Sequence, residues 1–176
     1  MAAEKLPYLN YNIMDILLVI IIVYVVISLF AYFAHKSLHQ KWSGKYNKSH
    51  MAHHIALYPA DNYLSEKYRD AGKDDAIWFF AIISVPILLL PIIFGIIGMP
   101  LHLVIISIIE MLFLGYFNNF IHHTYHVKNH WISKVPVINI LYRKLQHLHY
   151  IHHKYMQKNL GIFDFTWDVL FKTYKK

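Results

Sequence analysis

Long stretches without a formal charge constrain this chain more than any other feature. Residues 16–34 are 19 consecutive residues with no Asp, Glu, Lys or Arg, rich in Ile, Val and Leu and bounded by Asp15 and His35. A helix rises 1.5 Å per residue, so about 20 apolar residues cross the hydrocarbon core of a bilayer. The stretch therefore predicts a membrane-spanning helix, and it is longer than the apolar core of a cleaved signal sequence.

A second apolar region is too long for one straight span. Residues 76–109 carry no Asp, Glu, Lys or Arg, and after Glu110 the apolar character resumes as far as Ile121. Gly95, Gly98 and Pro100 interrupt the region, and such residues favour the end of one helix and a turn. We therefore expect an all-α integral membrane protein with about three transmembrane spans, in a single domain over residues 1–176 (spans about 16–34, 76–97 and 101–121).

The positive charges are distributed unevenly around these spans. Of the 17 Lys and Arg residues, one lies in residues 1–15, seven lie in residues 35–75 and nine lie in residues 122–176. By the positive-inside rule the two basic segments are cytoplasmic. The formal net charge of +7 is then a consequence of topology, and no motif indicates a nucleic-acid partner. We expect a multi-pass protein of the endoplasmic reticulum in a eukaryote, or of the cytoplasmic membrane in a prokaryote.

Histidine is the unusual residue of this chain. Thirteen of its 14 histidines lie in the two segments expected to be cytoplasmic, and there is no cysteine, which excludes thiolate metal sites. The histidines form two HxxxH and two HxxHH motifs, in the order His35 and His39; His50, His53 and His54; His122 and His126; His149, His152 and His153.

The spacing of these motifs indicates metal binding. Residues at i, i+3 and i+4 share one face of a helix, so each motif directs its imidazoles toward one point. Imidazole is a good ligand for iron, zinc, copper and nickel. Because eight to ten histidines exceed the ligands of one ion, we expect two metal ions in a His-rich helical cap on the cytoplasmic face, close to the bilayer surface.

Two other kinds of dinuclear or zinc site are excluded by the sequence. Carboxylate-bridged sites in helical bundles use Glu-x-x-His motifs, yet neither Glu66 nor Glu110 has a histidine three residues later. The His-Glu-x-x-His motif of zinc proteases is also absent. The chain shows neither a glycine-rich nucleotide-binding fingerprint nor a haem-binding motif, so a redox enzyme of this kind would need electrons from a separate protein.

The four motifs in this order resemble the fatty acid hydroxylase/sterol desaturase superfamily over roughly residues 31–176. The stretch from His50 to Pro59 is similar to the lipid hydroxylase branch. The stretch from Gly161 to Thr173 is similar to the closing Gly…Trp-Asp…Phe-x-Thr segment of the family. The resemblance implies a non-haem di-iron centre that uses O₂ and external electrons to hydroxylate a C–H bond of a lipid, either a fatty acyl chain or a sterol-like molecule. A small cytochrome or a ferredoxin, with its reductase, is the implied electron donor.

By this resemblance ten histidines are the metal ligands: His35, His39, His50, His53, His54, His122, His126, His149, His152 and His153. The register of the third motif is open, because His126 and His130 form an alternative pair in which His130 replaces His122. Asn119 stands where the family has an aspartate. We therefore expect Asn119 to orient an imidazole by a hydrogen bond, with less charge than a carboxylate would supply.

Other functions remain open at this point. A carotenoid ring hydroxylase or a lipid desaturase would use the same chemistry, although the carotenoid enzymes favour a longer gap within the first motif and a shorter link to the second. A non-catalytic metal-binding membrane protein is the alternative of a different class. The sequence identifies neither the lipid nor the carbon attacked.

Overall fold

The computed structural model describes residues 13–69 and 73–176, with side chains described for 13–69 and 84–176. The regular secondary structure of this part of the chain is helical, apart from one isolated bridge between Ser65 and Val127. The main helices are α1 Ile13–Leu38, α2 Lys45–Ala52, α3 Lys73–Ile96, α4 Leu101–Tyr125, α5 Pro136–Lys154 and α6 Thr166–Leu170. The predicted all-α class is thus confirmed for the described residues.

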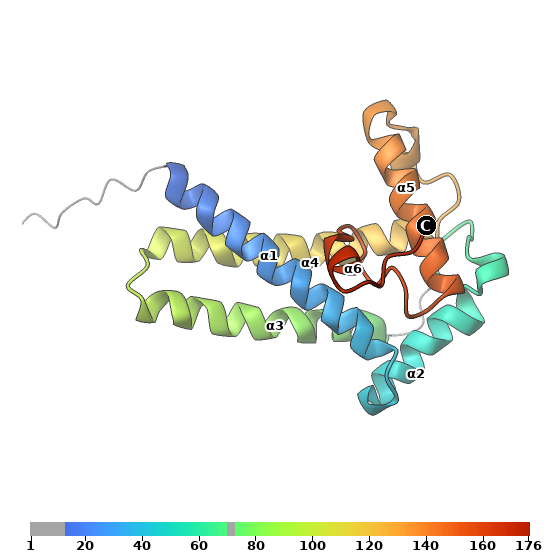
Figure 1. The fold of residues 1–176 in the computed structure, drawn as a ribbon, viewed down its shortest axis with the longest axis horizontal. Coiled ribbons are helices and arrows are strands. Elements are labelled where there is room, and N and C mark those ends of the chain that lie inside the picture. Colours follow the sequence, from blue (N-terminus) through green and yellow to red (C-terminus); the bar gives the residue numbers. More distant parts are fainter. Residues whose placement is uncertain (1–12, 70–72) are drawn as a thin grey trace, which may run out of the picture.

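Helices α1, α3 and α4 run along the long axis of the molecule and form its elongated part (Figure 1). Helix α3 ends at Ile96 and α4 begins at Leu101, so the chain reverses at the break expected between the two apolar stretches. Gly98 makes this turn with φ of 72°, a conformation that side-chain-bearing residues rarely adopt. The apolar region 76–121 is therefore a helical hairpin.

Two helices of this group, α1 and α4, are long and apolar enough to cross a membrane. The predicted third span, 76–97, corresponds to α3, whose described side chains form the shorter apolar stretch Ser84–Ile96. Large apolar side chains such as Leu18, Ile21, Ile109 and Phe113 are exposed on α1 and α4. An exposed apolar surface of this extent is what a bilayer would cover.

The contact between α1 and α4 is a close-packed apolar core. Val19, Val23 and Ile27 of α1 pack with Leu103, Met111 and Leu114 of α4. Ser28 and Ser107 are buried among them, and each hydroxyl donates to a carbonyl of its own helix, to Val25 and Val104 respectively. Because lipid tails are as apolar as these side chains, tight packing holds such helices together.

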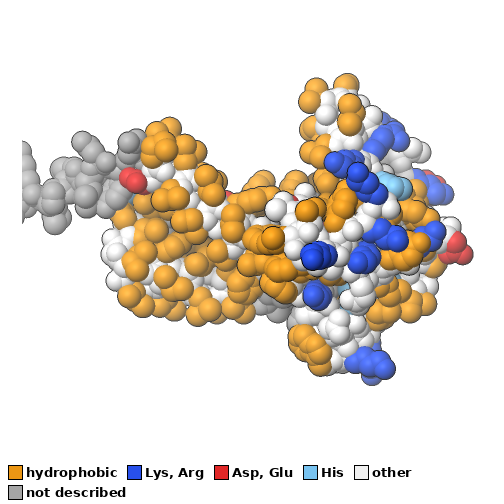
Figure 2. All heavy atoms as spheres, in the orientation of Figure 1, with side chains coloured by type: hydrophobic (Ala, Val, Ile, Leu, Met, Phe, Trp, Pro, Cys, Tyr) orange, Lys and Arg blue, Asp and Glu red, His pale blue; other side chains and the backbone are white. Residues whose placement is uncertain are grey.

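One end of the elongated group carries a polar cap, made mainly of α2 and α5. Helix α2 lies at the end of α1 and α5 lies at the end of α4, and Lys and Arg side chains gather over this end (Figures 1 and 2). The described C-terminal residues return from the cap along α1, where Phe163 packs against the α1–α4 core. Two hydrogen bonds fix this return, from Tyr24 to Asp164 and from the Trp167 indole to Ser28, each 2.9 Å long.

Candidate metal centre

One group of five histidines, called group 1, lies where α1 meets the cap. Its members come from the end of α1, from α2, from the turn after α2 and from α5: His35, His39, His50, His54 and His152. The Nε2 atoms of four of them form a closed ring, with separations of 3.2 Å (His39–His152), 3.1 Å (His39–His50), 3.1 Å (His50–His54) and 3.2 Å (His54–His152). Four nitrogens at these separations lie about 2 Å from their common centre, which is the usual distance from an imidazole nitrogen to a transition metal.

A second group, called group 2, lies beside the first, where α4 meets the cap. It contains His53, His122, His126, His149 and His153. The Nε2 atom of His149 is 3.0 Å from that of His126 and 3.2 Å from that of His153. In each group the five ligand atoms lie within 4.8 Å of one another, so each group could surround one ion.

Each HxxHH motif serves both groups. His50 and His54, four residues apart, belong to group 1, whereas His53 between them belongs to group 2. In α5 the division is reversed, because His149 and His153 belong to group 2 and His152 belongs to group 1. Each group is thus built from one HxxxH pair, the outer pair of one HxxHH motif and the middle histidine of the other.

The local structure after α2 contributes to this division. Residues His53–Leu57 form a π-helical turn that follows directly on the α-helical residues Lys45–Ala52. A π-turn carries one more residue than an α-turn and so changes the direction of the side chains that follow. The ring of His53 is 4.7 Å from that of His126, and the ring of His54 is 4.8 Å from that of His152.

Backbone carbonyls hold four of the imidazoles. The Nδ1 atoms of His35, His126, His152 and His153 lie 2.7–2.9 Å from the carbonyl oxygens of Leu160, Tyr63, Lys158 and Tyr58, respectively. A carbonyl can only accept, so Nδ1 carries the proton and donates. The Nε2 of the neutral ring then carries a lone pair that points into the group, which is the form that binds a metal ion.

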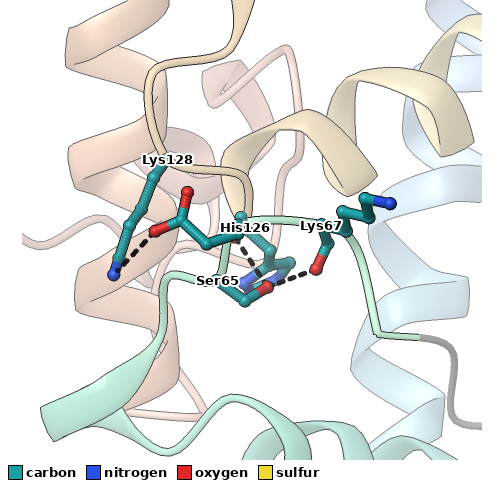
Figure 3. Close-up of polar contacts among 5 residues, drawn as sticks. Ser65, Lys67, His126 and Lys128 are labelled. Atoms are coloured by element: carbon teal, nitrogen blue, oxygen red, sulfur yellow. Dashed lines mark hydrogen bonds and ion pairs between the residues drawn. The ribbon is translucent and has the colours of Figure 1, made fainter.

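The loop before α3 supplies one of these carbonyls and is itself fixed to the end of α4. The Ser65 amide donates to the His126 carbonyl and the Lys128 amide donates to the Ser65 carbonyl, each over 2.9 Å. The Ser65 hydroxyl also donates to the Lys67 carbonyl, and Lys128 pairs with Glu66 at 3.3 Å (Figure 3). These contacts hold the Tyr63 carbonyl against His126.

The charge state of the cap favours cation binding. Burial, reinforced by neighbouring histidines, lowers the pKa of His39 to about 3. Burial lowers the pKa of His153 to about 4, although its hydrogen bond to the Tyr58 carbonyl acts in the opposite direction. Burial is also the largest cause of the lowered pKa values of six other histidines: His50, His53, His54, His126, His149 and His152. Neutral imidazoles with convergent lone pairs are the donor set that a transition-metal ion requires, so the residues present fit two such ions.

The structure thus brings together all ten histidines expected to bind metal and leaves two other expected residues apart from the groups. His130 lies outside both groups, half-buried, with its ring near Phe120 and Trp131 and its Nδ1 accepting from the Ile132 amide. Asn119 is half-buried on α4, and within the described residues no hydrogen bond joins it to a histidine. Its expected orienting function stays a prediction.

Several residues around the groups have contacts that the sequence patterns did not predict, including one, Tyr58, within the stretch that resembles the lipid hydroxylase branch. Tyr58 is fully buried, and its ring stacks on His126 at 4.0 Å while its carbonyl holds His153. Leu160 and Lys158 hold imidazoles through their backbone carbonyls, and because every residue type carries a carbonyl, the sequence does not indicate this contact. The Gly161 to Thr173 segment was recognisable only by its resemblance to a family pattern.

A comparison with models of known protein families shows which family this chain belongs to. The model described as Fatty acid hydroxylase matches residues 20–173. The chain belongs to the fatty acid hydroxylase family. No curated protein and no solved structure matches it. The family match includes both histidine groups and the C-terminal segment up to Thr173, and membership of this family indicates an oxidoreductase.

Proposed function

We propose that this fatty acid hydroxylase family member is a membrane-bound di-iron oxygenase that hydroxylates a C–H bond of a lipid. The observation that carries the proposal is the pair of buried five-histidine groups at one end of the apolar helices. Both groups are made of imidazole alone, and each has its donor atoms within 4.8 Å of one another. The ten histidines, which are the ligand set expected from the sequence, would hold one ion in each group.

Two iron ions, when bound, would supply O₂ activation, in which a lipid C–H bond, one O₂ molecule, two external electrons and two protons give an alcohol and one water molecule. The protein holds neutral imidazoles in fixed tautomers through the carbonyls of Tyr58, Tyr63, Lys158 and Leu160. The burial of His53, His126, His149 and His152, each 0% exposed, excludes bulk water from the groups.

The substrate would approach from the apolar helices. A small pocket lined by residues including Tyr32 of α1, Asn118 of α4 and Gly161 lies between these elements. Tyr32 precedes His35 by three residues and Asn118 precedes His122 by four, so the pocket is one helical turn from both groups on the apolar side. A lipid chain that enters between α1, α4 and residues 161–164 would therefore meet the histidine groups end-on.

The membrane arrangement that goes with this function has three spans, α1, α3 and α4, within one domain, and the cap faces the cytoplasm. The concentration of Lys and Arg at the cap supports this orientation (Figure 2). The same basic surface would suit an acidic carrier, such as a small cytochrome or a ferredoxin, as the source of electrons.

Lipid mass spectrometry tests the proposed function. Membranes of one host would be compared after expression of the wild type, of the His152→Ala/His153→Ala variant and of the His147→Ala variant at matched protein levels. His147 is exposed on α5 and lies outside both groups, so its removal should preserve activity. Hydroxylation is supported if a lipid gains one oxygen with the wild type and with His147→Ala but not with His152→Ala/His153→Ala.

The other outcomes assign a different function. Loss of two hydrogens would indicate a desaturase, and an oxidised product found only in a carotenoid-producing host would indicate a ring hydroxylase. The absence of any product in lipid and carotenoid hosts, with iron bound and an electron donor co-expressed, would leave a non-catalytic metal-binding protein.

A further inference from the structure

Within the described part of the chain, the backbone carbonyls of segment 158–161 bond to imidazoles of group 1 and to none of group 2. The Lys158 carbonyl accepts from His152 at 2.8 Å and the Leu160 carbonyl accepts from His35 at 2.7 Å. Both histidines belong to group 1. The carbonyls that hold the histidines of group 2 come instead from Tyr58 and Tyr63. What fixes segment 158–161 therefore acts directly on two imidazoles of group 1.

Asp168 of α6 fixes this segment. Its carboxylate accepts from the Leu160 amide at 2.8 Å, from the Gly161 amide at 2.7 Å and from the Thr173 hydroxyl at 2.7 Å. The side chain is 0% exposed. Burial raises the pKa of Asp168 above its ordinary value, and the three donors offset this rise only in part. Because every one of the three partners donates to the carboxylate, the site is built for the anion.

The Asp168 carboxylate and His35 are bonded to opposite edges of one peptide group. The Leu160 carbonyl and the Gly161 amide belong to the same planar unit, whose oxygen and hydrogen point in opposite directions. The carboxylate accepts from the amide edge and His35 donates to the carbonyl edge. Hydrogen bonds in such a chain polarise one another, so a negative charge at one edge makes the oxygen at the other edge a stronger acceptor.

Gly161 permits this close approach. A Cβ at this position would lie 2.1 Å from the Asp164 carbonyl oxygen and 3.0 Å from the Asp168 carboxylate. The contact with the Asp164 backbone is too close to form without a shift of the backbone, whereas the contact with the Asp168 carboxylate would need an adjustment of only a few tenths of an ångström. The Asp168 carboxylate thus binds the Gly161 amide at a position where the absence of a side chain leaves room for it.

We propose that Asp168 is a positioning residue for metal binding in group 1, acting on His35 through the Leu160–Gly161 peptide. A carboxylate that hydrogen-bonds a metal-binding histidine directly orients the ring and makes its other nitrogen a better donor. Here the peptide group transmits both effects. The inference rests on the proposed metal-binding function of group 1, and it assigns to the C-terminal segment a function in retaining that metal.

The test is the rate at which a chelator removes metal from the full-length protein in detergent. The wild type and the Asp168→Asn variant would be loaded with Co²⁺ or Zn²⁺ as the probe and exposed to a chelator, and the metal retained would be measured by mass spectrometry. The wild type should release two equivalents slowly. Asp168→Asn should release one equivalent about tenfold faster and the other at the wild-type rate, since loss of such partners typically costs 10- to 100-fold in metal affinity.

A matched control separates positioning from general stability. Trp167→Phe removes the 2.9 Å hydrogen bond from the neighbouring indole to Ser28 and leaves segment 158–161 untouched. It should lower thermal stability and release both equivalents at the wild-type rate. Thr173→Val removes one of the three donors to Asp168 and should accelerate the release of one equivalent by a smaller factor than Asp168→Asn does. Thr173→Val therefore serves as the milder variant if Asp168→Asn folds poorly.

Combined variants identify the affected group. His152→Ala weakens group 1 and His149→Ala weakens group 2. Asp168→Asn added to His152→Ala should leave the remaining equivalent as firmly held as before, whereas Asp168→Asn added to His149→Ala should loosen it. Equal acceleration of both equivalents, or no acceleration, in Asp168→Asn would overturn the inference. A wild type that binds no metal would instead overturn the proposed function.

Discussion

Neighbouring histidines of one motif belong to different groups, and this has a measurable consequence. His53 lies in group 2 and His54 lies in group 1. We expect His53→Ala and His54→Ala each to lose one of two bound metal equivalents, because each removes a ligand from one group only. The double variant should lose both equivalents. Elemental analysis of the purified variants, normalised to protein, makes the comparison.

The control pairs two ligands of the same group. His53→Ala combined with His126→Ala affects group 2 alone, so that variant should keep one equivalent. Were it to lose as much metal as the His53→Ala/His54→Ala variant, the division of the motif between two groups would be wrong.

The neutral histidines also predict how the metal-free protein responds to pH. Burial lowers the pKa of His39 to about 3 and that of His153 to about 4, against 6.5 in an unfolded chain. Between these values the unfolded state binds more protons than the folded state, so the free energy of unfolding falls as the pH falls below 6.5. Each histidine that stays neutral in the folded state lowers the free energy of unfolding by about 1.4 kcal/mol per pH unit in this window.

Thermal unfolding of metal-free protein in detergent at pH 8, 6.5 and 5 measures this effect. The midpoint should change little between pH 8 and 6.5 and should fall markedly by pH 5. The His147→Ala variant, which removes an exposed histidine, should give the same profile. A midpoint that rises toward pH 5 would show that the groups are stabilised by protonation and would contradict the burial argument.

At the level of helices, the sequence was informative wherever a pattern is local. The apolar stretches predicted α1 and α4, and Gly98 marked the turn between α3 and α4 because a tight reversal needs its backbone freedom. The i, i+3 and i+4 spacing also predicted that the histidines would converge. These properties depend on neighbours within a few residues, which is why they can be derived from the sequence.

The assembly of the two groups was not predictable in the same way. The division of each HxxHH motif depends on the π-helical turn at His53–Leu57 and on how α2 and α5 pack. The carbonyls of Tyr58 and Leu160 hold imidazoles through backbone atoms, which every residue type carries. Asp168 is 8 residues from Leu160 and 133 from His35 along the chain, yet it is linked to both.

Helix α5 has an apolar surface that the rest of the protein does not cover. Val137 is 89% exposed and Ile140 is 79% exposed, and the helix projects sideways from the axis of the elongated group (Figure 1). A helix in this position would lie in the membrane interface with its apolar side against the acyl chains. Trp131, which is 61% exposed just before α5, provides a natural probe.

Quenching by brominated lipids in nanodiscs measures the depth of this region. To isolate the signal, Trp42, Trp78 and Trp167 would be replaced by Phe. We expect lipids brominated near the headgroup to quench Trp131 more strongly than lipids brominated near the chain end. Val137→Asp/Ile140→Asp should reduce the quenching, whereas Arg143→Gln, on the same helix, should not. Equal quenching with and without the aspartates would show that this face does not hold the region in the membrane, and no quenching of Trp131 at all would place the region in water.

At the scale of the whole molecule, the distribution of side chains is inverted relative to a water-soluble protein. Apolar residues are exposed along α1 and α4, whereas the imidazoles are buried in the cap. The arrangement is consistent with one apolar part immersed in lipid and one polar part, rich in Lys and Arg, in water (Figure 2). The two histidine groups lie at the boundary between the two parts, where a lipid and an electron donor could both reach them.

The orientation of this arrangement can be tested because the chain contains no cysteine. Single cysteines would be introduced at Lys48 in α2 and at Lys172 near the C-terminus, both exposed in the polar part, and at Ile97 in the turn between α3 and α4. In sealed vesicles of known orientation, a membrane-impermeant maleimide should label the first two from the cytoplasmic side only and Ile97→Cys from the opposite side only. Labelling of Lys48→Cys and Lys172→Cys from opposite sides would contradict a cap built on one membrane face. Labelling of all three from the cytoplasmic side would show that the α3–α4 hairpin re-enters the membrane without crossing it, and the two histidine groups would then have to be reached by lipid from a single leaflet.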